Sequence, residues 1–446
     1  MARRFSSLLV CLFAPGLSSC WRPLPNVAVE AEILAATGVA ADLTFAVEGR
    51  PLDEPEPELG DGRLGWEQAL RTVVTTDPRI QEALARVRAA VAAAHQARAL
   101  PNPILGLVLR WGPGAPQVEA GLTEAVVGLL RQPRRVRIAD FELRAAAAHA
   151  LTVALDVVLD VQAHYAQAQA ADGLVPLLEQ RAQALASLLD VAESRLRNGE
   201  GTQAEVATLA SQRAQLEVEV AAARAQQRES RLRLARRVGV PSSAADWRLD
   251  RWRAPDLVAG DERAWIDAAL AHRAELRTLD WRLAALDDER AGAGTLPLRD
   301  ASVGIEAQRS PDWFSGPSLS VPVPVFDDGS PERARLDAEI AGLRHARTLA
   351  MRQAVEEVRV AFAAFEAQSD NLRRVREVLI PLQRRRREQA ESAYRLGQAD
   401  TTVLFLAEQD LRAAEAHALQ LEREVSTARF RLQRAAGGAH AQPEDR

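Results

Sequence analysis

Side chains that could do chemistry are few and widely spaced in this sequence. Its seven histidines stand apart, without the spacing of a zinc-binding helix and without an acidic cluster beside them. Both cysteines, Cys11 and Cys20, lie near the N-terminus, which excludes a disulfide framework or a cysteine metal site elsewhere. The run Arg384 to Arg387 would point around a whole helix, so we expect solvated arginines or pairs with neighbouring glutamates. The sequence therefore predicts no catalytic residue, no metal site and no cofactor.

The one modification that the sequence suggests is at the N-terminus. Arg3 and Arg4 precede a short apolar run at 6–13, which is typical of a signal peptide over residues 1–19. Leu-Ser-Ser then leads into Cys20 and resembles a bacterial lipobox, in which the cysteine is acylated; an ordinary secretory signal with an incidental cysteine is the alternative. Trp21 replaces the aspartate that would suggest retention at the inner membrane, so we expect a lipid-anchored protein of the Gram-negative outer membrane.

The composition points to long helices. The 446 residues are 47% hydrophobic and 26% charged but only 4% aromatic, and Ala, Leu, Arg, Glu and Gln dominate. Such a composition favours helices packed closely through small side chains. Every basic residue is arginine, and the net charge of −5 gives no global bias toward nucleic acid. Beyond the first twenty residues no continuous apolar run reaches the ~18 residues that a membrane helix needs.

The body of the chain is a tandem duplication. Asp77-Pro78-Arg79-Ile80 corresponds to Arg273-Ala274-Glu275-Leu276 at an offset of 196, and Ser194, Gly199 and Gly239 correspond to Ser392, Gly397 and Gly437 at 198. A unit this long is a complete structural half rather than a solenoid repeat. We therefore divide the chain into a signal peptide (1–19), a lipidated cysteine with a Pro/Glu-rich tether (20–63), a first repeat (64–239), a linker (240–261), a second repeat (262–438) and a tail (439–446).

Each half has the same order of expected elements. A helix of about thirty residues is followed by two β-like runs and then by two long helical stretches. The first half has the helix at 66–99, strands at 104–111 and 117–127, and long helices at 133–196 and 203–237. The second half has the helix at 262–294, strands at 301–309 and 317–326, and long helices at 331–395 and 402–435. Pro176 and Pro381 fall inside long helices and should kink or interrupt them.

The last helical stretch carries a coiled-coil seam. Its apolar residues follow strict 3-4 spacing over four heptads: Leu404, Ala407, Leu411, Ala414, Ala418, Leu421, Val425, Ala428 and Leu432. The first-half counterparts include the polar residues Arg213, Gln227 and Ser230, so that copy should pack less tightly or face some water. Helices this long need lateral helical partners.

The β-like runs alternate with period two, as in membrane-barrel strands. Leu105, Leu107 and Leu109 share one face, as do Leu319, Val321, Val323 and Val325, and Trp111, Trp313 and Phe314 flank the tip loops. Glu124 falls on an apolar face, so that strand either bulges or places Glu124 at a rim. Because an open edge in lipid is not viable, several copies must pool their strands, two giving eight and three giving twelve.

With these features the chain resembles the TolC-like outer-membrane efflux protein family, over about residues 64 to 438. The halves match its helix–hairpin–long-helix order, Leu100-Pro101-Asn102-Pro103 precedes the first strand as in heavy-metal efflux members, and Tyr394-Arg395-Leu396-Gly397 lies at a helical tip. The lipobox looks like the lipoprotein branch. The resemblance implies a mainly α protein with membrane β: a homotrimer whose twelve-strand barrel continues into a periplasmic α-helical tunnel. It also implies an exit duct that passively conducts small molecules or ions exported by an inner-membrane pump through a periplasmic adaptor.

The resemblance also suggests which residues carry the role. The turns at 195–201 and 394–400 match the tips that meet the adaptor, with Leu196, Gly199, Tyr394, Leu396 and Gly397 as contact candidates. The two glycines would also permit the helix reversal by themselves.

The periplasmic gate departs from part of the family. Where some members carry paired aspartates this chain has Val403 and Leu406, which suggests an apolar constriction or else ordinary coiled-coil packing. Glu205 is the first-half counterpart of Val403 and would form a carboxylate ring or an interface salt bridge.

Two other classes of protein are alternatives to an exit duct. A periplasmic lipoprotein scaffold or adaptor without a pore would share the anchor and the long helices, but it does not predict duplicated alternating hairpins. An enzyme on a helical scaffold would need converging titratable residues, which the sequence lacks.

Overall fold

A computed structural model describes most of the chain, and it divides into two compact units. The described residues are 23–25, 27, 29–37, 62–113, 116–252, 255, 257, 260–298, 300–309, 312–323, 325–326, 328–396 and 398–438. The first unit comprises the described parts of Met1–Val29, Glu82–Leu151 and Ala274–Arg352. The second comprises those of Glu30–Gln81, Thr152–Arg273 and Gln353–Arg446. The signal peptide, Cys20, Gly397 and the tail from 439 lie outside the described residues.

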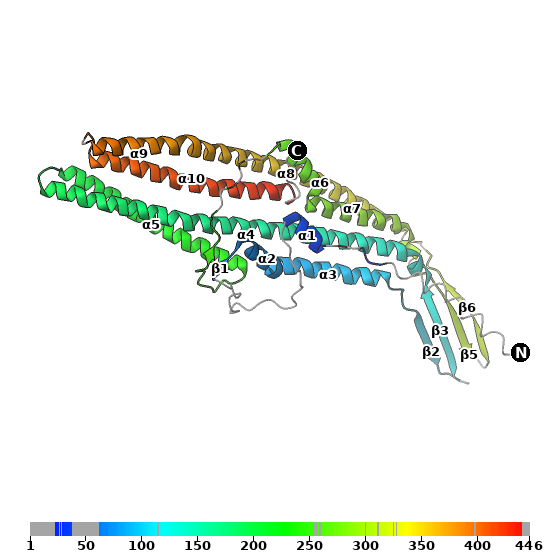
Figure 1. Cartoon of the computed structure of the whole chain (residues 1–446). Coiled ribbons are helices and arrows are strands. Elements are labelled where there is room, and N and C mark those ends of the chain that lie inside the picture. The colour runs from blue at the N-terminus through cyan, green and yellow to red at the C-terminus, as the bar shows by residue number, and fades with distance from the viewer. Residues whose placement is uncertain are drawn as a thin grey trace. The chain divides into compact units, whose positions relative to one another are not determined.

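The first unit contains a four-stranded antiparallel sheet in the order β2-β3-β5-β6 (Figure 1). Its strands are β2 (Ile104–Arg110), β3 (Gln117–Ala125), β5 (Ser302–Arg309) and β6 (Trp313–Ser320). The two hairpins join through β3 and β5, where Leu122 pairs with Ile305. The sheet of one chain is open, with β2 and β6 as its edge strands.

The strand expected at 317–326 is wrong in position. β6 runs from Trp313 to Ser320, so the strand begins four residues earlier than expected, and Trp313 at its start flanks the tip loop as predicted. Ser320 pairs with Ser302, the first residue of β5, and the chain before β5 forms the 3-10 helix η1 (Ala293–Leu298). The ladder therefore has no partner for residues beyond Ser320, and Pro322 has no N–H to donate.

Gly304 is the position in the sheet that tolerates no side chain. A Cβ there would lie 2.4 Å from the carbonyl oxygen of Leu122 and 2.7 Å from Cγ2 of Thr123. We expect Gly304→Ala to separate β3 from β5 and to lower the free energy of unfolding by about 3 kcal/mol. Urea unfolding followed by circular dichroism measures the loss. Gly316→Ala is the matched control, because a Cβ at Gly316 meets nothing within 4 Å; equal midpoints for the two variants would contradict the prediction.

The long helices extend over more of the chain than the sequence pattern predicted. α4 (Val126–Arg197) begins directly after β3 rather than at 133, and its 72 residues correspond to a length of about 108 Å. α5 is Gln203–Val238, α8 is Ser330–Arg374, α9 is Ile380–Arg395 and α10 is Thr401–Ala435. The stretch Val127–Arg197 has an 18-residue window of mean hydropathy 1.4, and 56% of that window is buried inside the protein. This is the burial expected of a core helix.

The two prolines in the long helices behave differently. A π-helical turn, η2 (Val375–Leu379), precedes Pro381, and the N–H of Ile380 bonds to the carbonyl of Val375. This wider turn separates α8 from α9 and confirms the interruption expected there. α4 continues as a helix through Pro176, so of the kink or interruption expected there the interruption does not occur.

The helices expected at 66–99 and 262–294 are each two helices. α2 (Trp66–Thr76) and α3 (Pro78–Arg98) meet at Asp77, and α6 (Glu262–His272) and α7 (Ala274–Gly292) meet at Arg273. Asp77 and Arg273 have nearly the same extended backbone, with φ/ψ of −63/124° and −61/121°. Pro78 accounts for the first break, because it disfavours a helical residue before it. The second break has no proline and recurs at the duplicated position.

The duplication is also visible in the helix ends. Gly239 and Gly437 both have a left-handed backbone, with φ of 92° and 96°. The N–H of Val240 bonds to the carbonyl of Ala235, and the N–H of Gly438 bonds to that of Gln433, 198 residues later. Both are Schellman caps, which need φ > 0 at the glycine.

The coiled-coil seam of α10 lies in the core of the second unit. The eight seam residues from Ala407 onward are all less than 10% exposed. The five from Ala418 to Leu432 belong to one buried cluster with Phe365, Leu372 and Trp265. In α5 the polar counterparts find partners: the side chain of Gln227 donates to Asp172 over 2.9 Å, and the Ser230 hydroxyl donates to the carbonyl of Gln227. At these two positions hydrogen-bonded polar side chains replace the apolar contact. The side chain of Arg213 is 43% exposed and pairs with Glu217 of its own helix.

Two elements in and beside the predicted tether were not expected. α1 (Val29–Thr37) lies within 20–63 and buries Ile33, and β1 (Arg63–Leu64) pairs in parallel with β4 (Arg248–Leu249). The proline and glutamate content of residues 51–58 dominated the pattern, so the short helix-forming run before it was missed.

Candidate functional site

The two faces of the sheet differ sharply in chemistry. The register places Leu105, Leu122 and Ile305 in one row and Leu107, Ala120 and Ala307 in the next. This apolar face is exposed in the single chain: its larger side chains are Leu105 (75%), Leu107 (63%), Leu122 (52%), Ile305 (50%) and Leu319 (72%). An exposed apolar surface of this extent marks an interaction with lipid or protein.

Glu124 lies at a rim. β3 pairs with β5 without interruption from Val118 to Ala125, so the strand has no bulge, and Glu124 is its penultimate residue. The rim alternative of the sequence analysis is therefore the correct one.

The opposite face of the sheet is mainly polar and carries three charged side chains; its exposed apolar side chains are Ile104, Val108 and Phe314. Arg110 and Glu119 form an ion pair at 3.0 Å across β2 and β3. Glu306 is exposed on β5 and lies in a row with Gly121 on one side and Gly316 on the other. Sequence reasoning did not single out Glu306, because only the register reveals its neighbours.

The first helical tip of the second unit joins α4 to α5. Gly199 has φ of 78°, and the N–H of Glu200 bonds to the carbonyl of Arg195 in a Schellman cap. Thr202 caps α5, its hydroxyl accepting from the N–H of Glu205. Leu196 is half-buried in this turn, whereas Gly199 is exposed. Gly199 therefore supplies the left-handed backbone that this helix reversal needs.

The second tip, between α9 and α10, exposes apolar side chains. Leu396 is 68% exposed and Tyr394 is 44% exposed. The N–H of Gln398 bonds to the carbonyl of Ala393, the same bond as at the first tip at an offset of 198. Gly397 lies outside the described residues. A pocket of about 390 Å³ opens beside this tip, lined by Leu188, Tyr394, Leu404 and Phe405 with Arg387 and Glu408.

Four side chains join the two tips, and we call them the tip latch: Arg195, Glu205, Asp400 and Thr402. The guanidinium of Arg195 contacts the carboxylate of Asp400 at 2.6 Å and lies 3.9 Å from Glu205. The hydroxyl of Thr402 donates to Glu205 over 2.9 Å. Of these, sequence reasoning found only Glu205, as a ring or a salt bridge. It missed the other three, because no local pattern reports a contact between residues about 200 positions apart.

The gate candidates lie just beyond the latch on α10. Val403 is 49% exposed and Leu406 is 37% exposed, while Phe405 between them is buried against the α4–α5 core. Val403 and Leu406 therefore lie outside the core packing of the described chain. The surface they form is exposed in the single chain.

The arginine run on α9 is largely paired with acidic residues. Arg386 contacts Asp410, Arg387 lies 3.1 Å from Glu408, and Arg384 lies 3.9 Å from Glu415. These three partners lie on α10, whereas the sequence analysis expected neighbouring glutamates; the pair of that kind is Arg387 with Glu391 at 3.4 Å. Within the described part of the chain no group of three His, Cys, Asp or Glu residues is placed to hold a metal ion.

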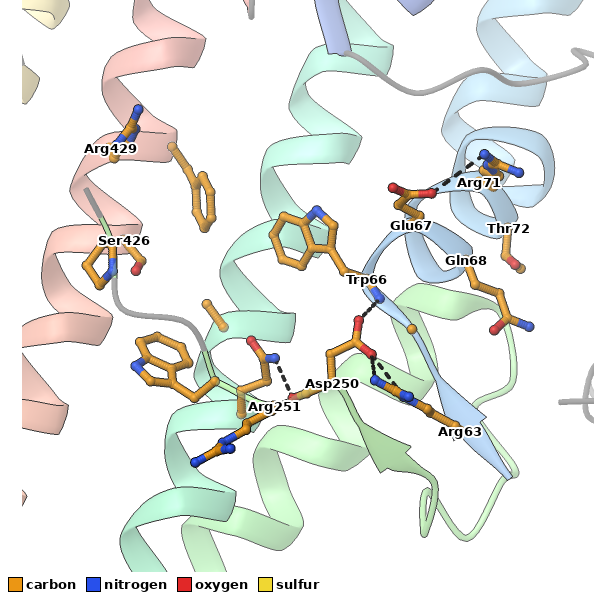
Figure 2. A pocket seen from close by; sticks show the side chains of 16 residues that line it. Arg63, Trp66, Glu67, Gln68, Arg71, Thr72, Asp250, Arg251, Ser426 and Arg429 are labelled. Atoms are coloured by element: carbon orange, nitrogen blue, oxygen red, sulfur yellow. Dashed lines mark hydrogen bonds and ion pairs between the residues drawn. The ribbon is translucent and has the colours of Figure 1, made fainter. Parts of the chain in front are cut away.

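A pocket of about 820 Å³ lies between α2, α4, α10 and the segment after β4 (Figure 2). Asp250 lies between the backbone N–H of Trp66 and the guanidinium of Arg63, both at 2.7 Å (Figure 2). The bond from Trp66 is the main reason that the pKa of Asp250 is lowered. Burial raises the pKa of Tyr165 to about 12, and its hydroxyl donates to the carbonyl of Leu64. These bonds fasten the linker to the start of α2.

Solved structures share this arrangement of hairpins and helices. No protein-family model matches the chain, and no curated protein matches it significantly. The outer-membrane protein VceC of Vibrio cholerae matches with a TM-score of 0.68 at 18% identity, over 84% of this chain and 96% of VceC. The chain has the TolC-like fold.

Two further outer-membrane channels agree with this. The outer-membrane channel OprN matches with a TM-score of 0.67 at 20% identity, over 85% of this chain and 91% of OprN. The open-state MtrE channel of Neisseria gonorrhoeae matches with 0.67 at 15% identity, over 88% and 97%. At these identities the likeness establishes the TolC-like fold that the sequence resemblance predicted.

Proposed function

We propose that this TolC-like chain is the outer-membrane exit duct of a tripartite efflux system. Three copies close a twelve-strand barrel, and their long helices form a periplasmic tunnel. The duct conducts small molecules or ions passively, and an inner-membrane pump and a periplasmic adaptor deliver them. An acylated Cys20, released from its signal peptide, anchors each copy in the outer membrane.

The open antiparallel sheet with one exposed apolar face is the observation that carries this proposal. Its edge strands β2 and β6 run antiparallel to each other, so the β6 edge of one copy can pair with the β2 edge of the next. Pairing around a ring satisfies every edge N–H and C=O, which lipid requires. Three copies of four strands give an interior wide enough for a lumen.

The height of the sheet fits a membrane once the residues after β6 are included. A strand of eight residues tilted by about 40° rises about 20 Å, short of the ~25 Å apolar band of outer-membrane barrels. Val321, Val323 and Val325 follow β6 and are 51%, 78% and 70% exposed. They extend the apolar surface toward α8.

The tips supply the adaptor contact and the gate in this proposal. Leu396 and Tyr394 offer exposed apolar contacts. Leu196, Gly199 and Gly397 are the other proposed contact residues. Val403 and Leu406 form the constriction, and Glu205 acts in the tip latch beside them. A pore-free scaffold would leave the apolar face of the sheet unexplained.

Single-channel recording together with native mass tests the proposal. The full-length protein, extracted in detergent, should have the mass of a trimer and give reproducible pores in planar bilayers. A trimer that inserts with very small conductance would indicate a closed resting gate. A monomer, or a form that never inserts, would overturn the proposal and favour the scaffold.

A further inference from the structure

One row of the sheet combines a single carboxylate with glycines. Gly106 pairs with Gly121, Gly121 with Glu306, and Glu306 with Gly316, so the row crosses all four strands on the polar face. A Cβ at Gly121 would lie 3.2 Å from Cγ of Glu306, so the glutamate side chain extends over that glycine. A Cβ at Gly316 would meet nothing within 4 Å. Glu306 is thus the only residue of this row that is not glycine.

Glu306 also carries the uncompensated charge of this face. Within the four strands the other charged side chains of the polar face are Arg110 and Glu119, which neutralise each other at 3.0 Å. Among the described residues no arginine or histidine lies within ion-pair distance of the Glu306 carboxylate. The Glu306 side chain is exposed. The polar face therefore has a net charge of about −1 per chain at neutral pH.

We propose that Glu306 sets the charge selectivity of the duct inside the barrel, favouring cations over anions. This inference rests on the proposed trimeric duct, in which the polar face lines the lumen. Three copies bring three Glu306 carboxylates to one height in the barrel. The other residues of this row are glycines, so the lumen is widest at this height. Glu306 is then a specificity-determining residue rather than a ligand of a bound ion.

The dimensions of a twelve-strand barrel determine whether the three Glu306 carboxylates bind one ion together or only attract cations into the lumen. Strands about 4.8 Å apart and tilted about 40° give a backbone radius of about 12 Å, which leaves the carboxylates about 7 Å from the axis. At that separation they cannot chelate one ion together. With a Debye length of about 10 Å at 0.1 M salt, they still change the cation-to-anion ratio on the axis by about tenfold. At 1 M salt the same estimate falls to about twofold.

A cysteine probe beside Glu306 measures this local potential directly. Gly316→Cys places a thiol in open space across the ladder from Glu306. In the full-length protein in lipid vesicles, we measure the rates at which this thiol reacts with a cationic and an anionic methanethiosulfonate of similar size. The protein that keeps Gly316 is the blank for reaction at other cysteines. We expect the cationic reagent to be favoured, and Glu306→Gln to lower the rate ratio by about tenfold at 0.1 M salt. Any shift in the thiol pKa cancels in the ratio.

Glu124→Gln is the matched control, since it removes the same charge at the rim of the other face and should leave the ratio unchanged. A rate ratio that Glu306→Gln also leaves unchanged, in a protein that forms pores, would overturn this inference and leave the proposed duct intact. If Gly316→Cys does not assemble, the reversal potential of Glu306→Gln in a KCl gradient decides instead: an unchanged value overturns the inference. A protein that forms no pore in any background overturns both.

Discussion

Replacing Leu396 by aspartate is expected to abolish export while leaving the assembled protein intact. Leu396 is 68% exposed at the second tip, where the proposed adaptor contact needs apolar side chains such as Leu396 and Tyr394. Central apolar anchors of an interface contribute about 2 kcal/mol or more, so an aspartate there should weaken binding by about 30-fold or more. The measurement is the inhibitory concentration of exported compounds in cells that depend on this duct. It should fall to that of cells lacking the protein.

Leu382→Asp is the matched control for this change. Leu382 is 54% exposed on α9, about 21 Å along the helix from Leu396, so it introduces the same charge away from the tip. We expect this variant to export normally and both variants to have the native mass of the unchanged protein. Normal export by Leu396→Asp would remove Leu396 from the adaptor contact.

Local periodicity predicted the features that depend on a single element. The 3-4 spacing of α10 is such a case, because a repeated apolar stripe can bury itself in only one orientation; Ala407, Val425 and Leu432 are all buried. The alternation in β2, β3 and β5 likewise placed the apolar face correctly. In these cases the spacing of apolar residues within one element determines which face is apolar.

Features that depend on distant partners were missed or misplaced. β6 ends at Ser320 because β5 offers no residue beyond Ser302, although the alternation in the sequence continues through Val325. The break at Arg273 has no proline to signal it. Glu306 appeared as one polar residue among several until the register placed it between glycines. In each case the deciding neighbour is far away in sequence.

Breaking the tip latch is expected to open the duct. In the double variant Arg195→Ala/Thr402→Val both links between the tips are lost, the Arg195–Asp400 pair at 2.6 Å and the Thr402–Glu205 bond at 2.9 Å. The groups are partly exposed, so together they contribute about 1 to 2 kcal/mol per chain. In the proposed trimer three latches add, and a bias of about 3 kcal/mol or more shifts an opening equilibrium over 100-fold. Because α10 begins at the latch, Val403 and Leu406 move with it, and single-channel conductance should rise at least tenfold.

Arg197→Ala separates this effect from a general change of charge at the tip. Arg197 is two residues from Arg195 but pairs at 3.8 Å with Glu193 of its own helix, so it joins no second turn. Its removal should leave the conductance unchanged. Exchanging the partners, as Arg195→Asp with Asp400→Arg, should restore a low conductance, because the pair is re-formed with reversed polarity. If the latch variant conducts no better than Arg197→Ala, then the four side chains stabilise the turns alone, and the resistance of the resting duct must arise at Val403 and Leu406 by contact between copies.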